Sequence, residues 1–189
     1  MRYGIIAIAA LLALGSAANA QEDAAMRPEI RTFLGALIPT GDHRDDFKSA
    51  TTLGVQGAIE LSKYAHVVGS FAWSNGHAKF ASLSDDLTNV WHYDVGGEFN
   101  AYYDTDLFVV RPFFGLGVGG RTYDYAASGQ ESRTCTTGYG ALGAELQVGS
   151  VAVRTEGRDY INCFQSPISG RKSTRNDVML TLGFAYHLW

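Results

Sequence analysis

The histidines are the residues of this chain best suited to bind a metal ion or to act as a catalytic base. The sequence contains five of them: His43, His66, His77, His92 and His187. They show none of the short, recurrent spacings by which metal ligands are recognised in a sequence. The sequence therefore predicts no metal site, and no cofactor is expected.

Hydrolytic chemistry would require a serine, a histidine and a carboxylate that converge on one site. The segment WSNGH, from Trp73 to His77, and the later His92 supply serine and histidine toward the same side of the molecule. No spacing typical of a catalytic triad accompanies them. We therefore assign no catalytic residue from the sequence.

The two cysteines, Cys135 and Cys163, flank the dipeptide Gly149-Ser150 almost symmetrically. If that dipeptide is a hairpin turn, both cysteines come close together at the far end of one hairpin. An even number of cysteines in an exported protein is typical of a disulfide, and we predict one here, with free thiols as the alternative. A regular ladder would place the two side chains on opposite faces, so the bond would require a bulge or a distorted loop.

Charged residues alternate with other residues along several segments, which places them on one face of each segment if it is a strand. If Asp104-Thr105 forms a two-residue turn, Glu98 lies directly opposite Arg111. Opposed unlike charges stabilise a hairpin by roughly 0.2 to 1 kcal/mol.

The turn at Gly149-Ser150 places Glu145 opposite Arg154 in the same way. If this face is enclosed, its charges must be paired, because a lone buried charge is very costly. We predict an interior ion-pair network with a structural or gating role. Its expected members are Arg31, Glu60, Glu98, Arg111, Glu145, Arg154, Glu156 and Arg158.

These side chains must be positioned by strands, and period-two alternation predicts eight of them. The connections between them alternate between short and long, which favours an up-and-down barrel over a Greek-key sandwich. The predicted fold is thus all-β: an eight-stranded antiparallel up-and-down transmembrane β-barrel. Its expected strands are Glu29–Thr40, Thr52–Ser62, His66–Ser74, Val90–Tyr103, Asp106–Tyr125, Thr137–Gly149, Val151–Cys163 and Val178–Trp189.

The N-terminus has the features of a secretory signal peptide. Arg2 precedes the apolar run Ile5–Leu14, and Ala18-Asn19-Ala20 offers the small residues that a signal peptidase recognises. We predict a signal peptide over residues 1–20 and one β-barrel domain over residues 21–189. The apolar run is too short for a spanning helix. The net charge of −4 is small and mixed in sign, which argues against a nucleic-acid partner.

The last strand and the segment Arg111–Gly120, with sequence RPFFGLGVGG, resemble the small eight-stranded outer-membrane barrels, the OmpA-like transmembrane domain and the OmpX-like group. The resemblance covers almost the whole mature chain. It implies that the last strand carries the signal for the barrel assembly machinery and pairs with the first strand. The residues of this signal are Thr181, Gly183, Tyr186, Leu188 and Trp189, although Phe is the commoner final residue.

We expect the barrel to be a monomer. The resemblance implies a location in the outer membrane of a Gram-negative cell, in contact with outer-membrane lipids and lipopolysaccharide. The favoured hypothesis is a non-enzymatic barrel with a structural or surface-interaction role. The polar segments Gly41–Lys48 and Ser169–Asp177 fit such a role. Three alternatives stay open: a narrow small-solute channel, a lipid A-modifying enzyme, and a soluble periplasmic lipocalin-like carrier.

Overall fold

The computed structural model describes residues 27–41, 43–77, 79, 87–125, 132–165 and 172–188. The predicted signal peptide and Trp189 lie outside these ranges. Two short elements, α2 (His43–Asp46) and β5 (Tyr103–Asp104), accompany eight long strands. The long strands are β1 (Pro28–Thr40), β2 (Ala50–Ser62), β3 (Ala65–His77), β4 (Leu87–Asn100), β6 (Val109–Tyr125), β7 (Arg133–Val148), β8 (Val151–Gln165) and β9 (Lys172–His187). Among the described residues, no helix is long and apolar enough to cross a membrane.

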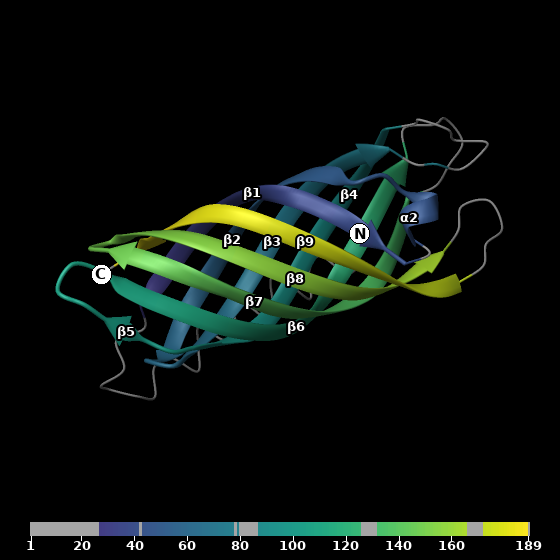
Figure 1. Cartoon of the computed structure of the whole chain (residues 1–189). Helices are drawn as coiled ribbons and strands as arrows, with labels where there is room; N and C mark the ends of the chain where they lie inside the picture. The colour runs from purple at the N-terminus through teal and green to yellow at the C-terminus, as the bar shows by residue number, and fades with distance from the viewer. Residues whose placement is uncertain are drawn as a thin grey trace.

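The eight long strands form a closed antiparallel barrel, as predicted (Figure 1). Consecutive long strands pair with each other, and β9 pairs with β1 from Glu29 opposite His187 to Thr40 opposite Asn176. The last strand is therefore the seam of the barrel. Closure leaves no strand edge unpaired, which a strand protein in lipid requires because the hydrocarbon offers no hydrogen bonds.

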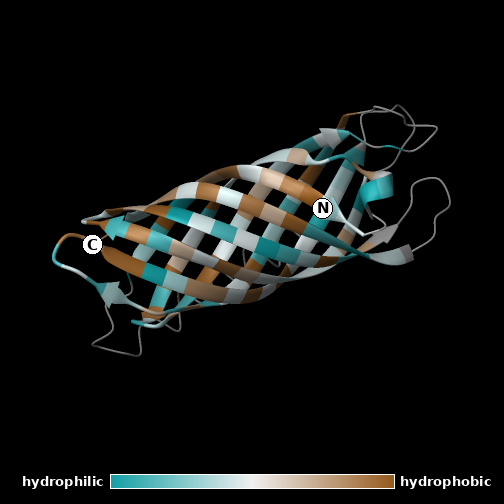
Figure 2. Ribbon diagram, viewed as in Figure 1, coloured by the Kyte–Doolittle hydropathy of each residue, from teal (hydrophilic) through white to brown (hydrophobic). Residues whose placement is uncertain are grey.

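Hydrophobic and hydrophilic residues alternate along the strands (Figure 2). The large hydrophobic side chains of these strands are mostly exposed, so the outward face is predominantly apolar. On β9, Leu182 is 50% exposed and Phe184 is 61% exposed, whereas Met179 and Ala185, which have the opposite parity on the same strand, are buried. A soluble lipocalin-like carrier would place its apolar side chains inside. The hypothesis of such a carrier is therefore wrong, because this barrel presents its apolar face to the surroundings.

The turn between β4 and β6 differs from the predicted one. Thr105 and Phe108 close a four-residue turn, in which the Thr105 nitrogen donates to the Phe108 carbonyl at 3.0 Å. The β4–β6 register therefore shifts, and Glu98 lies opposite Gly115 rather than opposite Arg111. The predicted Glu98–Arg111 cross-strand pair is wrong for this reason. The shift is even, so both side chains still face inward.

The turn at Gly149-Ser150 forms as predicted. Gly149 has a φ of 61°, a left-handed conformation that glycine adopts without strain. Glu145 accordingly lies opposite Arg154 on the neighbouring strand. The start of β1, the end of β9 and the short turns share one end of the barrel, which is the periplasmic end in barrels of this kind.

The predicted disulfide is not formed, because Cys135 and Cys163 are both free thiols in the structure. The β7–β8 ladder continues in regular register to the pair Thr137 and Asn162. Without a bulge, Cys135 faces inward and Cys163 faces outward. The Cys163 thiol instead lies 3.7 Å from the Thr136 carbonyl oxygen.

Candidate functional site

The barrel interior holds most of the charge of the strands. Its buried charged side chains reach it because alternate residues of each strand must face inward. They comprise five arginines and six carboxylates: Arg31, Arg111, Arg121, Arg154, Arg158, Glu29, Asp94, Glu98, Glu145, Glu156 and Asp177. In a narrow enclosed lumen, such charges persist only if they are paired and hydrogen-bonded.

The layer nearest the periplasmic end is centred on Arg111. Its guanidinium forms an ion pair with Glu145, directly opposite on β7, and lies 3.0 Å from the His187 Nε2 atom. It also lies 3.6 Å from Glu29 of β1, which three strands separate from β6 in either direction around the ring. This layer therefore spans the full width of the lumen.

The same layer contains the donor atoms of a metal site. The ligand atoms of Glu29, Glu145 and His187 lie within 4.8 Å of one another, and all three side chains are buried. A carboxylate pair with an imidazole could hold a divalent ion such as zinc. Arg111, however, already supplies the positive charge between these groups, so the arrangement as it stands is an ion-pair cluster.

The next layer is centred on Glu98 of β4. Its two carboxylate oxygens accept hydrogen bonds from Arg31 of β1 at 2.9 and 3.1 Å and from Arg154 of β8 at 2.5 Å. Arg154 also donates to Glu156 at 2.9 Å, and its Nη1 atom lies 3.6 Å from a Glu145 oxygen. Neither β1 nor β8 neighbours β4, so these bonds reach through the lumen and not along the sheet.

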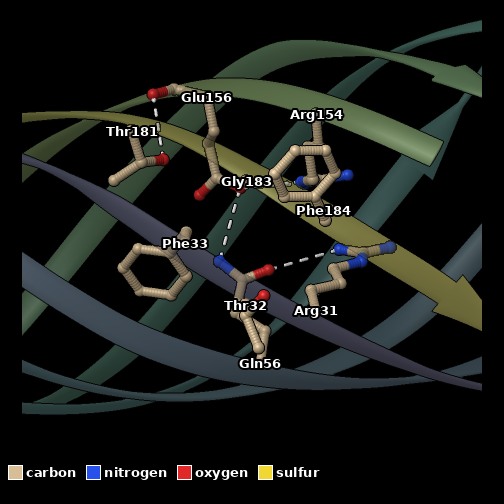
Figure 3. Close-up of a pocket in the computed structure, with 9 residues that line it drawn as sticks. All are labelled: Arg31, Thr32, Phe33, Gln56, Arg154, Glu156, Thr181, Gly183 and Phe184. Atoms are coloured by element: carbon tan, nitrogen blue, oxygen red, sulfur yellow. Dashed lines mark hydrogen bonds and ion pairs between the residues drawn. The ribbon is translucent and has the colours of Figure 1, made fainter.

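The space within this layer is small. Arg31, Gln56, Arg154 and Glu156 line a cavity of about 10 Å³ (Figure 3). That volume is close to the minimum needed for one water molecule. Gln56 contacts both sides of the cavity, because its amide accepts from Arg31 at 3.4 Å and donates to Glu156 at 3.5 Å.

Farther from the periplasmic end, Arg158 forms the third layer. It is paired with Glu156 and lies 3.3 Å from Asp94. Its Nη1 atom donates to Ser70 of β3 at 2.9 Å, and β3 lies directly across the ring from β8. Tyr160 donates to the same Asp94 carboxylate at 2.7 Å.

The fourth layer contains a serine and a histidine in contact. Arg121 is paired with Asp177, and its Nε atom donates to the Nδ1 atom of His92 at 3.1 Å. Because arginine can only donate, Nδ1 of His92 carries no proton, and the ring proton of the neutral imidazole lies on Nε2. That atom lies 3.0 Å from the Ser74 hydroxyl, so the imidazole donates to Ser74. A catalytic base would have to accept from the serine at this nitrogen.

Among the described residues, an apolar cluster lies on the outer side of these layers. The first long connection carries α2 and turns Phe47 inward, where only 3% of this residue is exposed. The Phe47 ring meets that of Tyr123 edge to face at 6.5 Å. The surrounding cluster also contains Leu37, Val90 and Met179. The backbone nitrogen of Lys48 donates to the His77 carbonyl at 2.9 Å and holds the connection to the end of β3.

Seven of the eight residues expected in the interior network lie in these layers. Glu60 does not join them: it is half-buried opposite His66, and no ion pair connects it to the other described residues. The eight expected members did not include five residues of these layers: Glu29, Asp94, Arg121, Asp177 and His187. The inward parity of these residues was a usable signal, although Glu29, Asp177 and His187 lie close to the ends of the predicted first and last strands.

The expected assembly signal lies on β9 and just after it. Thr181 and Gly183 face inward, whereas Tyr186 and Leu188 face outward and are 50% and 37% exposed. Gly183 lies against β1, since a Cβ atom there would come within 2.3 Å of the Thr32 carbonyl. Recognition of these residues by assembly machinery remains a prediction.

Residues 7–189 match the profile of the family described as "Outer membrane protein beta-barrel domain". No curated protein matches the chain. Among solved structures, the fold is similar to Neisserial surface protein A, with a TM-score of 0.61, 10% identity, and coverage of 84% of this chain and 96% of that one.

Two structures from Pseudomonas aeruginosa are also similar. The outer membrane protein OprG has a TM-score of 0.61 and 18% identity, and the match covers 87% of this chain and 96% of that one. The N-terminal β-barrel domain of OprF has a TM-score of 0.55 and 13% identity, with coverage of 86% and 97%. At these identities the similarity establishes the fold alone.

Proposed function

Because this chain belongs to the outer membrane protein beta-barrel domain family, we propose that it is a non-enzymatic, closed barrel that acts in the outer membrane through its outer surface. The observation that carries this proposal is the set of contacts across the lumen. Arg111 reaches Glu29, and Arg158 reaches Ser70, each from the opposite side of the ring. Side chains that meet in the middle of the lumen leave no continuous path between them.

The closed state has two independent barriers. The ionic layers block the periplasmic and middle parts of the lumen, and Phe47 packs with apolar side chains such as Tyr123 on the outer side of these layers. An eight-stranded barrel has an interior just wide enough to be filled by side chains, which fits this arrangement. An ion would have to displace an ion-paired arginine and then cross an apolar plug.

The contact between Ser74 and His92 does not favour a lipid-modifying enzyme. Both side chains are buried in the lumen, with exposed fractions of 0% and 1%, so they do not face the lipid. The hydrogen bond from Arg121 also leaves His92 with its proton on the atom that faces the serine. This pair therefore supports a structural role, as part of the fourth layer.

The proposal is tested by reconstituting the protein in planar bilayers and recording current under an applied voltage. We expect no steady current from the wild-type barrel. The double variant Phe47→Ala and Glu98→Ala removes one residue from each barrier. We expect it to carry more current than the wild-type barrel. Steady current from the wild-type protein would overturn the proposal and favour the narrow channel. Release of an acyl chain from lipid A by the purified protein would overturn the non-enzymatic part.

A further inference from the structure

The outward aromatic side chains of the outer half of the barrel are confined to one side. A general interfacial girdle would distribute such residues around the barrel. We compared the halves of the strands that lie farther from the short turns. Among the described residues, all outward aromatic side chains in these halves lie on the paired strands β3 and β4: Phe71, Trp73, Trp91 and Tyr93. Toward the periplasmic end, exposed aromatics occur on β4, β6 and β9, including Phe99, Phe114 and Tyr186.

These aromatic rings pack on one another. Trp73 and Trp91 are direct cross-strand partners, with ring centroids 6.4 Å apart. Phe71 stacks on Trp91 at 5.6 Å with an interplanar angle of 25°. The result is a continuous aromatic surface with rings that hold one another in place.

Two asparagines extend this surface at the outer end. The Oδ1 atom of Asn89 accepts from the Trp73 indole nitrogen at 2.9 Å and from the Asn75 amide at 3.1 Å. These bonds fix both amides beside the indoles. The Asn89 amide nitrogen and the Asn75 amide oxygen have no bond to the other described residues.

Cations lie at the same end of β3. Lys79 follows this strand, and its ammonium donates to the Arg44 carbonyl at 2.6 Å. The side chains of Arg44 and Lys79 are exposed, as is that of Asp45 on α2. On β3 and the residues that follow it, the order toward the outer end is thus the aromatic Trp73, the amide of Asn75 and the cation of Lys79.

We propose that the β3–β4 patch, formed by Phe71, Trp73, Asn75, Asn89, Trp91 and Tyr93, binds the headgroup of a phosphorylated amino-sugar glycolipid of the lipid A type. The apolar C–H faces of sugar rings pack on indoles, amides bind sugar hydroxyl and acylamide groups, and cations attract phosphate. The acyl chains would continue along the apolar face below. This inference rests on the proposed function, since it assigns a partner to the outer surface.

The opposite side of the barrel lacks this combination. At the outer end of β7 and β9, the outward residues include Thr136, Gly138 and Asn176, with no described aromatic side chain between them. Asn176 therefore offers an exposed amide of the same chemical type outside the patch. It provides a matched control for Asn89.

The test uses the folded barrel in nonionic detergent, with Trp189→Phe as the background. The chain has three tryptophans, so the remaining fluorescence comes from Trp73 and Trp91. Titration with purified lipid A should give a saturable change in emission. Titration with phosphatidylglycerol, which has phosphate but no sugar, should give a much smaller one.

Asn89→Ala should weaken lipid A binding roughly 2- to 10-fold, the usual effect of one lost hydrogen bond. Asn176→Ala should leave binding unchanged. Equal responses to the two lipids, or equal effects of the two substitutions, would overturn the proposal. Heat-dependent gel mobility of each variant verifies that it is folded. If the barrel conducts ions and still binds lipid A through the patch, the proposal of a closed barrel is overturned and this inference stands.

Discussion

The middle of the lumen and its outer mouth are closed by different kinds of interaction. In the middle, Glu98 holds Arg31 and Arg154 from two strands that do not neighbour its own. At the mouth, Phe47 enters from a connection and packs on side chains such as Tyr123. The ionic layers tie strands together, so losing one partner leaves buried charge behind. The apolar plug belongs to a connection that is held to the end of β3 by the backbone hydrogen bond from Lys48 to His77.

Among these predictions, the largest loss in the free energy of unfolding should come from Glu98→Ala, in the ionic layers. This change leaves two buried guanidinium groups without a shared acceptor, and breaking a buried pair in this way typically costs about 3 to 5 kcal/mol. We expect a loss of that size in the free energy of unfolding, measured by denaturant titration in detergent micelles. Glu60→Ala, at a half-buried position, is the control and should change it by less than about 0.5 kcal/mol. A loss for Glu98→Ala as small as the one expected for the control would mean that the network adds no stability.

Phe47→Ala should have a smaller and more local effect. Burying a phenylalanine side chain contributes about 1.5 to 3 kcal/mol. We therefore expect the substitution to lower the stability of the connection that carries Phe47 by at most this amount. Hydrogen exchange should show faster exchange at the Lys48 amide, which bonds to His77, with little change in the centres of the strands. Equal acceleration in the strand centres would show that the plug and the ionic layers unfold as one unit.

The smallest effect should be that of salt on wild-type stability. The Arg31, Glu98 and Arg154 side chains are at most 6% exposed, so mobile ions cannot screen them as they screen surface pairs. Raising ionic strength from about 0.05 to 0.5 M should shift the free energy of unfolding by less than about 0.5 kcal/mol. A large loss of stability in salt would place these pairs in contact with solvent and weaken the distinction between the two regions.

Strand locations were largely predictable, because each strand alternates between an apolar and a polar row. The turn between β4 and β6 was one exception, and the outer ends were the other. The predicted strands begin at Val90, Thr137 and Val178, but β4, β7 and β9 begin at Leu87, Arg133 and Lys172. These extensions contain polar outward residues, so they interrupt the apolar alternation. Backbone pairing continues beyond that point because it does not depend on side-chain polarity.

The interior was predictable by face and not by partner. The sequence by itself determined which side chains point inward, since residue parity survives even the change from a two-residue to a four-residue turn at Thr105–Phe108. Only the tertiary structure decided that Glu98 binds Arg31 and Arg154 while Arg111 binds Glu145. The physical reason is that contacts through the lumen join strands that are not neighbours. The relative positions of such residues along the barrel axis depend on the strand stagger summed around the closed ring. No single hairpin specifies that sum.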